Sequence, residues 1–447
     1  MKTFTAMAAF AAAVLATPTP TENNLKPRAT LEAITVKGNA FFQGTKRFYM
    51  RGVDWQPGGS SKLVDPLADE TTCARDIAKF KDLGLNTVRI YTVDNSVNHD
   101  ACMQKLADAG IYLVLDVNTP LYSINRATPA PSYNAVYLQN IFATIDAFAA
   151  YSNVLAFFSG NEVINDDVTT NCAPYVKAVT RDMRQYIGSR GYRKIPCGYS
   201  AADVNSNRLE MAQYMNCGTD DERSDFFAFN DYSWCDPSTF TTSGWDQKVK
   251  NFTGYGLPLF LSEFGCNTNK REWNEIAALF SREMTGVYSG GLAYEYSEEG
   301  SKYGLVKIEG GSVTDLPEFA ALKAALAKTP SPTDDGGYNA TGGASNCPTK
   351  SANWDVENDN LPAIPSAAAE YMKTGAGKGV GLTGKGSQNA GGTSTGTAQP
   401  GSGSVTAVAS GTANGTKKSG APGPVGSQPF IVSGVVVAFT IFGAALL

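Results

Sequence analysis

Two segments decide the fold of this chain: Val154-Leu-Ala-Phe-Phe-Ser-Gly-Asn161-Glu162 and Pro258-Leu-Phe-Leu-Ser-Glu263-Phe-Gly-Cys266. Both are apolar enough to be strands buried on both faces, which is typical of parallel sheets. An ionisable side chain within such a strand is costly unless it reaches an open rim. We therefore expect Glu162 and Glu263 at the C-terminal tips of two parallel strands, on opposite sides of one cleft.

Six further runs of this kind alternate with helix-like stretches: Tyr49–Gln56, Thr87–Val93, Tyr112–Asn118, Ile195–Ser200, Phe226–Trp234 and Gly291–Glu298. Asp69, Asn134 and Asn171 precede periodic apolar stretches and are typical helix-start residues. Repeated strand–helix alternation predicts an α/β fold, a closed (β/α)8 TIM barrel, rather than an open doubly wound sheet. A hairpin around Gly44-Thr45 would feed the first barrel strand, and Pro317–Leu326 would be the closing helix.

Two carboxylates at facing barrel tips are suited to cleaving a glycosidic bond, and a separation of about 5 Å would define a retaining double displacement. Glu263 would attack the anomeric carbon. Glu162 would protonate the leaving oxygen and later deprotonate the incoming hydroxyl. Asn161 could hydrogen-bond the sugar 2-hydroxyl. The structural alternative is that each glutamate is only a paired carboxylate at a strand end.

Other strand tips supply candidate partners for these glutamates and for a sugar. They are Gln56, Arg89, Tyr91, Asp116, Asn118, Asp231, Tyr232, Trp234, Tyr294 and Tyr296. Tyr232 or Arg89 could hold Glu263 ionised, and the aromatic residues could stack on sugar faces or pack within the barrel. A second Asn-Glu dipeptide, Asn274-Glu275, lies in a helical pattern away from any strand tip, so Glu275 is expected on a solvated helix face.

Charge and histidine content exclude several classes of function. The chain has 37 basic and 42 acidic residues, and no basic block that would indicate nucleic-acid binding. A mildly acidic balance fits a neutral substrate such as a polysaccharide. His99 stands alone in the sequence, which disfavours a histidine-based zinc site and a Ser-His-Asp triad. We expect neither a metal nor a cofactor, and we expect His99 to be an ordinary surface or helix-start residue.

Both ends of the chain have the composition of targeting signals. Residues 1–16 combine Lys2, an Ala-rich apolar run and Ala16, which is typical of a secretory signal peptide. Residues 430–447 are apolar and uncharged and follow a polar spacer, which is typical of a signal for a glycosylphosphatidylinositol anchor. Ser419 or Asn414 would be the attachment residue. The alternative is a single C-terminal membrane span.

Export to an oxidising compartment agrees with an even set of eight cysteines, whose disulfide connectivity the sequence leaves open. Asn251 and Asn339 lie in glycosylation sequons, and Asn414 lies in a third. We expect a catalytic domain over residues 30–372. Residues 373–429 are rich in Gly, Ser, Thr and Ala, which predicts a flexible stalk.

With these residues assembled, the chain resembles the fungal β-1,3-glucanosyltransferases of glycoside hydrolase family 72, which are membrane-anchored enzymes that elongate cell-wall glucan. The matching segments are Tyr49-Met-Arg-Gly-Val-Asp-Trp-Gln-Pro-Gly-Gly59, Asn86-Thr-Val-Arg-Ile-Tyr-Thr-Val-Asp94, Ser159-Gly-Asn-Glu-Val-Ile-Asn165, Lys194-Ile-Pro-Cys-Gly-Tyr-Ser200, Leu261-Ser-Glu-Phe-Gly-Cys-Asn267 and Gly290-Gly-Leu-Ala-Tyr-Glu-Tyr-Ser-Glu-Glu299.

The resemblance implies Glu162 as the acid/base and Glu263 as the nucleophile. It implies a glucan cleft lined by Gln56, Tyr91, Asp116, Asn161, Tyr232 and Tyr296, and the disulfides Cys73–Cys102, Cys217–Cys347 and Cys235–Cys266. A fourth bridge, Cys172–Cys197, is expected from the two cysteines left over. Only Cys347 follows Cys266, so the chain resembles the family branch that lacks a cysteine-rich C-terminal module.

The function expected from these features is cleavage within a β-1,3-glucan and transfer of the new reducing end to the non-reducing end of another glucan. The enzyme would be a monomer, anchored by lipid at the outer face of the plasma membrane, in the cell wall. A retaining endo-β-1,3-glucanase would use the same carboxylates and differ only in letting water attack the intermediate. A third interpretation is a non-catalytic, wall-anchored binding or structural protein.

Overall fold

A computed structural model describes residues 31–357, 360–394 and 396–398. The predicted signal peptide 1–16, the predicted anchor signal 430–447 and the candidate attachment residues Ser419 and Asn414 lie outside these ranges. None of the helices within the described residues is long and apolar enough to cross a membrane.

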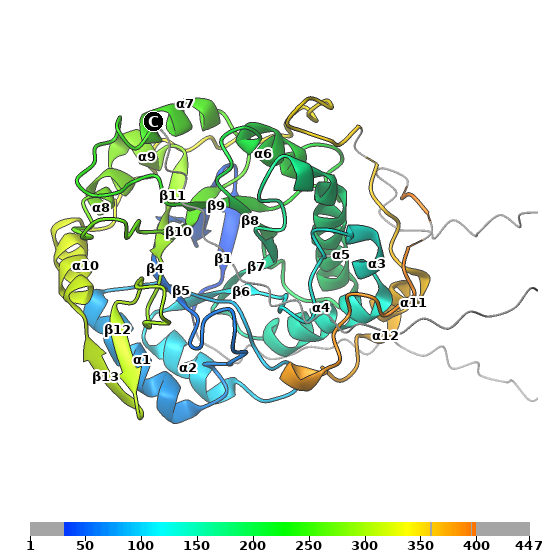
Figure 1. The fold of residues 1–447 in the computed structure, drawn as a ribbon, viewed down its shortest axis with the longest axis horizontal. Helices are drawn as coiled ribbons and strands as arrows, with labels where there is room; N and C mark the ends of the chain where they lie inside the picture. Colours follow the sequence, from blue (N-terminus) through cyan, green and yellow to red (C-terminus); the bar gives the residue numbers. More distant parts are fainter. Residues whose placement is uncertain (1–30, 358–359, 395, 399–447) are drawn as a thin grey trace, which may run out of the picture. The chain divides into compact units, whose positions relative to one another are not determined.

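Eight parallel strands close into one barrel, which confirms the predicted (β/α)8 fold (Figure 1). In order around the barrel they are β4 (Met50–Trp55), β5 (Thr87–Ile90), β6 (Tyr112–Asp116), β7 (Val154–Asn161), β8 (Cys197–Ala202), β9 (Phe226–Asp231), β10 (Leu259–Phe264) and β11 (Tyr288–Ala293). Closure comes from β11 pairing with β4, with Gly290 opposite Met50.

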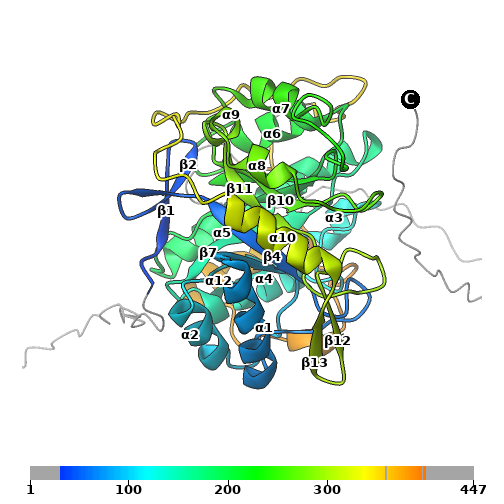
Figure 2. The same ribbon diagram turned by 90° about the vertical axis from the view of Figure 1, so that its left-hand side faces the viewer.

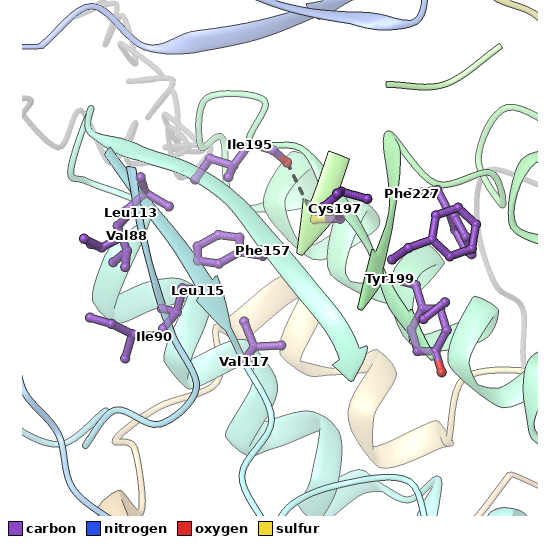
Figure 3. Packing of buried hydrophobic residues seen from close by; sticks show 14 of the residues in the cluster. Val88, Ile90, Leu113, Leu115, Val117, Phe157, Ile195, Cys197, Tyr199 and Phe227 are labelled. Atoms are coloured by element: carbon purple, nitrogen blue, oxygen red, sulfur yellow. Dashed lines mark hydrogen bonds between the residues drawn. The ribbon is translucent and has the colours of Figure 1, made fainter. Parts of the chain in front are cut away.

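Side chains alternate between the barrel interior and the helix layer, as the period of a strand requires. Figure 3 shows part of the outward row, in which Ile90, Leu115 and Phe157 pack together. A second cluster fills the interior and includes Met50, Val114, Phe158, Phe226 and Phe260. Phe158 and Phe226 meet edge to face, with ring centroids 5.3 Å apart.

A three-stranded antiparallel sheet packs its apolar face against one end of this interior. It consists of β1 (Ile34–Lys37), β2 (Ala40–Gln43) and β3 (Lys46–Phe48), and Figure 2 shows β1 and β2 at one end of the barrel. Phe41 is fully buried and contacts the rings of Phe226 and Phe260. The predicted turn at Gly44-Thr45 joins β2 to β3, and β4 then begins the barrel.

The helices begin largely where the sequence predicts. Asp69 caps α1 (Glu70–Leu83) by accepting from the Thr72 amide, and Asn134 caps α4 (Ala135–Phe148) in the same way. Asn171 does not cap α5 (Ala173–Ser189), because it lies within the short 3-10 turn η1 (Val168–Cys172). The closing helix α10 (Pro317–Lys328) packs against the barrel near α1 (Figure 2).

The remaining elements are short. They are α2 (Asp100–Asp108), α3 (Pro129–Ser132), α6 (Arg208–Asn216), α7 (Trp245–Phe252), α8 (Glu275–Leu279), α9 (Arg282–Thr285), the hairpin β12 (Val306–Glu309) and β13 (Ser312–Asp315), α11 (Ser366–Ala369), α12 (Tyr371–Thr374) and the 3-10 turn η2 (Gly381–Thr383). His99 immediately precedes α2, as expected of a helix-start residue, but it is not at the surface. It is buried, and its Nε2 lies 2.7 Å from Asp65.

Three disulfides are present: Cys73–Cys102, Cys217–Cys347 and Cys235–Cys266. These are the pairings that the family resemblance implied. The predicted Cys172–Cys197 bridge is wrong, since both thiols are unpaired and buried among the described residues. Burial raises the pKa of both, which disfavours the reactive thiolate.

The flexible stalk predicted over residues 373–429 does not begin at residue 373, and residues 399–429 lie outside the described ranges. Residues 373–394 and 396–398 lie on the barrel module, where Ala376, Ser387 and Ala398 are buried. The preceding segment packs there too, with Trp354, Leu361 and Ile364 almost fully buried. A Gly-rich segment can bury little apolar area. Residues 373–398 are held to the barrel instead by hydrogen bonds between their backbone and side chains of the barrel helices.

Candidate active site

A polar layer lies above the aromatic interior, at the C-terminal mouth of the barrel, and Arg89 is its centre. Arg89 projects from β5, is fully buried, and its guanidinium lies 4.5 Å from the centroid of the Phe158 ring. It binds both carboxylate oxygens of Asp116, at 2.8 and 3.1 Å. It also donates to Asn161 Oδ1 at 3.0 Å and to Glu263 Oε1 at 3.3 Å. One cation therefore ties together the tips of β6, β7 and β10.

Glu263 lies near the end of β10 and is 7% exposed. Tyr91 Oη donates to its Oε1 at 2.8 Å, and Tyr232 Oη donates to its Oε2 at 2.6 Å. The pKa of Glu263 is raised to about 7, mainly by burial and to a smaller extent by the nearby charge of Glu162, while Arg89 and the two tyrosine hydroxyls limit the rise. The donors thus favour the carboxylate of Glu263 despite its burial.

Glu162 follows β7 at the rim and is only half-buried. Its φ of 47° lies in the left-handed region, which is unfavourable for a residue with a Cβ. The surrounding structure holds it there: its amide donates to the Ser200 carbonyl at 2.9 Å, and Arg126 donates to its carbonyl oxygen. Its side chain accepts one hydrogen bond, from Asn230 Nδ2 at 2.8 Å.

Asn161 and Asn230 connect the two glutamates. Asn161 Oδ1 accepts from Arg89, from Ser200 Oγ at 2.8 Å and from Asn230 Nδ2 at 3.0 Å. This arrangement fixes the orientation of the Asn161 amide, and its Nδ2 has no protein partner in the described part of the chain. Asn230 was not among the predicted site residues, although it lies two positions before Tyr232 and two after the inward-facing Ala228.

A cavity of about 130 Å³ lies beside this network. It is lined by Gln56, Tyr91, Thr92, Asp116, Asn118, Pro120, Ser123, Gly160, Asn161 and Val163. Four of the predicted substrate-binding residues, Gln56, Tyr91, Asp116 and Asn161, are therefore brought together on one wall. Tyr232 lies on the other side of Glu263, where its ring meets those of Tyr294 and Tyr303 at centroid distances of 6.2 and 5.5 Å.

Two of the predicted substrate-binding residues do not reach the cleft. Arg89 is fully buried beneath Glu263 and positions it, as the sequence alternatively suggested. Tyr296 is 0% exposed, and its hydroxyl donates to Asp76 on α1 at 2.8 Å. Tyr294 is partly exposed beside Tyr232 instead. The strand β11 ends at Ala293, so the two tyrosines no longer point to the same side as they would in a continuous strand.

Other predicted tip residues support the site from outside the cleft. Asp231 is buried and binds Lys248 Nζ at 2.5 Å, which anchors the chain just before Tyr232. Trp234 is buried against Trp245 and is not a sugar platform. Glu275 is away from the strand tips, as predicted, but it is not solvated: it is 2% exposed, and burial raises its pKa to about 8.

Asp54 is a component that the sequence analysis missed. It projects from β4, is fully buried, and neither carboxyl oxygen has a hydrogen-bond partner among the described residues. Burial raises the pKa of Asp54 well above its usual range, although the charge of Arg89 opposes the rise. The Arg89 guanidinium donates to Asp116 and Glu263 and makes no hydrogen bond to Asp54 among the described residues.

Comparisons with known proteins agree with this arrangement. The family model for glucanosyltransferases of glycoside hydrolase family 72 matches residues 23–330. The chain is 70% identical to 1,3-beta-glucanosyltransferase gel1 of Aspergillus fumigatus over 380 residues, which cover 85% of this chain and 83% of that protein. It is 56% identical to 1,3-beta-glucanosyltransferase GAS5 of Saccharomyces cerevisiae, over 78% of this chain and 73% of that one.

Among solved structures, Saccharomyces cerevisiae Gas2p in complex with laminaritriose and laminaritetraose aligns with a TM-score of 0.71 and 39% identity, covering 75% of this chain and 78% of that one. The barrel, the paired glutamates and the extent of these matches lead to one assignment. The chain belongs to the glucanosyltransferase family, glycoside hydrolase family 72.

Proposed function

We propose that this chain is a retaining β-1,3-glucanosyltransferase, which cleaves β-1,3-glucan internally and transfers the new reducing end to the non-reducing end of a second glucan. The observation that carries the proposal is that two neighbouring carboxyl groups differ in their hydrogen bonds and in their exposure to solvent. Among the described residues, Glu263 receives three hydrogen bonds, from Arg89, Tyr91 and Tyr232, whereas Glu162 receives one and is half-buried at the rim. Such a pair divides nucleophilic and acid/base roles.

In the first step, a Glu263 oxygen attacks the anomeric carbon while the bond to the leaving glucan oxygen breaks, and Glu162 gives its proton to that oxygen. A glycosyl ester on Glu263 results. In the second step, the 3-hydroxyl of the acceptor attacks the same carbon, the ester bond breaks, and Glu162 takes the hydroxyl proton. Glu263 regains its negative charge next to Arg89, so the site returns to its starting state.

A short chain of hydrogen bonds joins the two carboxyl groups and favours retention over inversion. Arg89 donates to Glu263 and to Asn161, and Asn230 donates to Asn161 and to Glu162. An inverting pair would need room for a water between the carboxyl groups. Asn161 has Nδ2 available for the sugar 2-hydroxyl, and Gln56, Tyr91, Asp116 and Tyr232 supply further contacts to the glucan or to Glu263.

The same two carboxylates would serve transfer and hydrolysis, so the site alone does not distinguish the two reactions. The related proteins favour transfer. The gel1 and GAS5 proteins are named 1,3-beta-glucanosyltransferases, and Gas2p binds laminari-oligosaccharides. The endo-β-1,3-glucanase alternative would differ only in letting water reach the intermediate. A non-catalytic binding protein is disfavoured because both glutamates retain their donors.

The proposed location is the outer face of the plasma membrane and the cell wall, with a lipid anchor at Ser419 or Asn414 and a monomeric enzyme. The terminal sequences of the chain support the anchor. Asn251 is exposed at the end of α7, so it is the more accessible of the two candidate glycan sites within the described residues. Asn339 is half-buried, and its side chain accepts from the Thr341 amide.

Incubation with one defined laminari-oligosaccharide should yield products longer than the substrate, because a glucan acceptor competes with water for the glycosyl ester. Mass spectrometry of the product mixture over time measures this directly. Products that are only shorter than the substrate would show the hydrolase instead, and an unchanged substrate would favour the non-catalytic interpretation.

Replacing Glu162 by Gln should lower kcat on laminari-oligosaccharides by about 10²- to 10⁴-fold, because the leaving oxygen loses its proton donor. The thermal midpoint should stay close to that of the unchanged protein. An aryl laminarioside with an activated leaving group needs no proton, so its cleavage step should suffer much less. Glu283→Gln on the exposed surface of α9 is the matched control. Appreciable residual transfer on oligosaccharides would remove Glu162 from this role.

Replacing Tyr232 by Phe should shift the acidic limb of the kcat/KM pH profile to higher pH. The nucleophile must be ionised, so kcat/KM rises as pH passes the pKa of Glu263, which is about 7. The Tyr232 hydroxyl stabilises the carboxylate, and its removal therefore raises that pKa. Tyr175→Phe on α5 serves as the control. An acidic limb that stays in place or moves to lower pH would refute the role of Tyr232.

A further inference from the structure

Residues 375–394, called the strap below, cross the barrel module beside α4 and α5, where they are drawn in orange in Figure 1. Near the start of the strap, Ala376 is 6% exposed and its amide donates to Tyr186 Oη at 2.9 Å. Gln139 on α4 donates to the carbonyls of Ala376 and Lys378, at 2.9 and 3.0 Å. These bonds fix the first part of the strap to two barrel helices.

Its second part holds the loop of residues 119–128, which connects β6 to α3. The Ser387 amide donates to the Leu121 carbonyl at 2.9 Å. Gln388 Nε2 donates to the Ser123 carbonyl at 2.8 Å and to Ser123 Oγ at 3.1 Å. Asn134, the cap of α4, donates to the Ser387 carbonyl at 2.6 Å. Ser387 is fully buried, so this contact excludes water.

Glycine is required where the strap meets Tyr122 in this loop. A Cβ added to Gly384 would lie 2.0 Å from Tyr122 Oη, so any side chain there would push the two segments apart. Tyr122 is itself 3% exposed and cannot turn into solvent without unpacking the loop. The Gly-rich composition of the strap therefore allows close backbone approach at this position.

The loop that the strap holds has two tasks at the candidate active site. Pro120 and Ser123 line the cavity beside Asn161. Arg126 donates to the carbonyl oxygen of Glu162 and, at 3.0 Å, to that of Val163. The loop contains little regular structure of its own, so its geometry depends on bonds to neighbouring segments. A continuous set of contacts thus leads from Gln388 to the backbone of Glu162.

We propose that the strap is a positioning segment of the catalytic module, which clamps the 119–128 loop and so keeps Glu162 in place for proton transfer. This inference rests on the proposed role of Glu162. It assigns a part in the reaction to a segment that lies outside the matched family region, residues 23–330, and has the composition of a linker. Displacement of the acid/base by about 1 Å is enough to lower turnover substantially.

The test uses Gly384→Val and Gln388→Ala in the full chain. Gly384→Val forces the strap away from Tyr122, and Gln388→Ala removes the bonds to Ser123 without adding volume. Both should lower kcat on laminari-oligosaccharides, Gly384→Val by about tenfold or more and Gln388→Ala less. The loss should be much smaller for an aryl laminarioside with an activated leaving group, because that substrate does not need the proton of Glu162.

Lys385→Val is the matched control for Gly384→Val, because Lys385 is the exposed neighbour on the same strap. Gln104→Ala is the control for Gln388→Ala, since Gln104 is a half-buried glutamine whose amide bonds Asp108. If Gly384→Val fails to fold, the comparison of the two substrates with Gln388→Ala tests the proposal by itself.

Equal losses on both substrates, or turnover within about twofold of the controls, would overturn the proposal. An inactive unaltered chain would instead be a failure of the proposed function.

Discussion

The structure of the site depends on one buried cation. Arg89 lies at the barrel mouth with no solvent contact, and it binds Asp116, Asn161 and Glu263 from three different strands. A buried guanidinium without carboxylate partners would be very unfavourable, so the cation and its anions must be ordered together. The aromatic interior beneath it, with Phe158 against the guanidinium, gives a rigid floor. The same residues therefore position the catalytic groups and pack the interior of the barrel.

The two glutamates differ because the barrel places them at different depths. Glu263 is 7% exposed on a strand, where burial raises its pKa and only strong donors keep the carboxylate accessible near neutral pH. Glu162 lies one residue beyond its strand, in a left-handed conformation that the Ser200 carbonyl and Arg126 hold. Strain of this kind persists only where neighbouring structure fixes it. The strap and the 119–128 loop belong to that neighbouring structure, and so link a remote, Gly-rich segment to the acid/base.

The eight strands and both glutamates could be predicted from the sequence because buried parallel strands are apolar throughout. A glutamate within or next to such an apolar run is therefore easily recognised. The prediction failed for Tyr296, which lies beyond the end of β11, where side chains no longer alternate regularly. Tyr296 is fully buried, whereas Tyr294 is partly exposed beside Tyr232. Asp54 also interrupts an apolar strand, Met50–Trp55, but it was missed because only the residue just beyond that strand, Gln56, was considered as a site residue. The strap was misjudged because composition alone cannot distinguish glycines that confer flexibility from glycines that permit contact, as at Gly384.

The central claim is that Glu263, held by Arg89, forms the covalent bond to the sugar. A 2-deoxy-2-fluoro laminarioside with an activated leaving group slows the second step of a retaining enzyme more than the first, so it should trap the glycosyl ester. Proteolysis and tandem mass spectrometry of the labelled protein should then locate one glycosyl group on Glu263. A label on a different carboxylate, or release of product with inverted anomeric configuration and no label, would contradict the account.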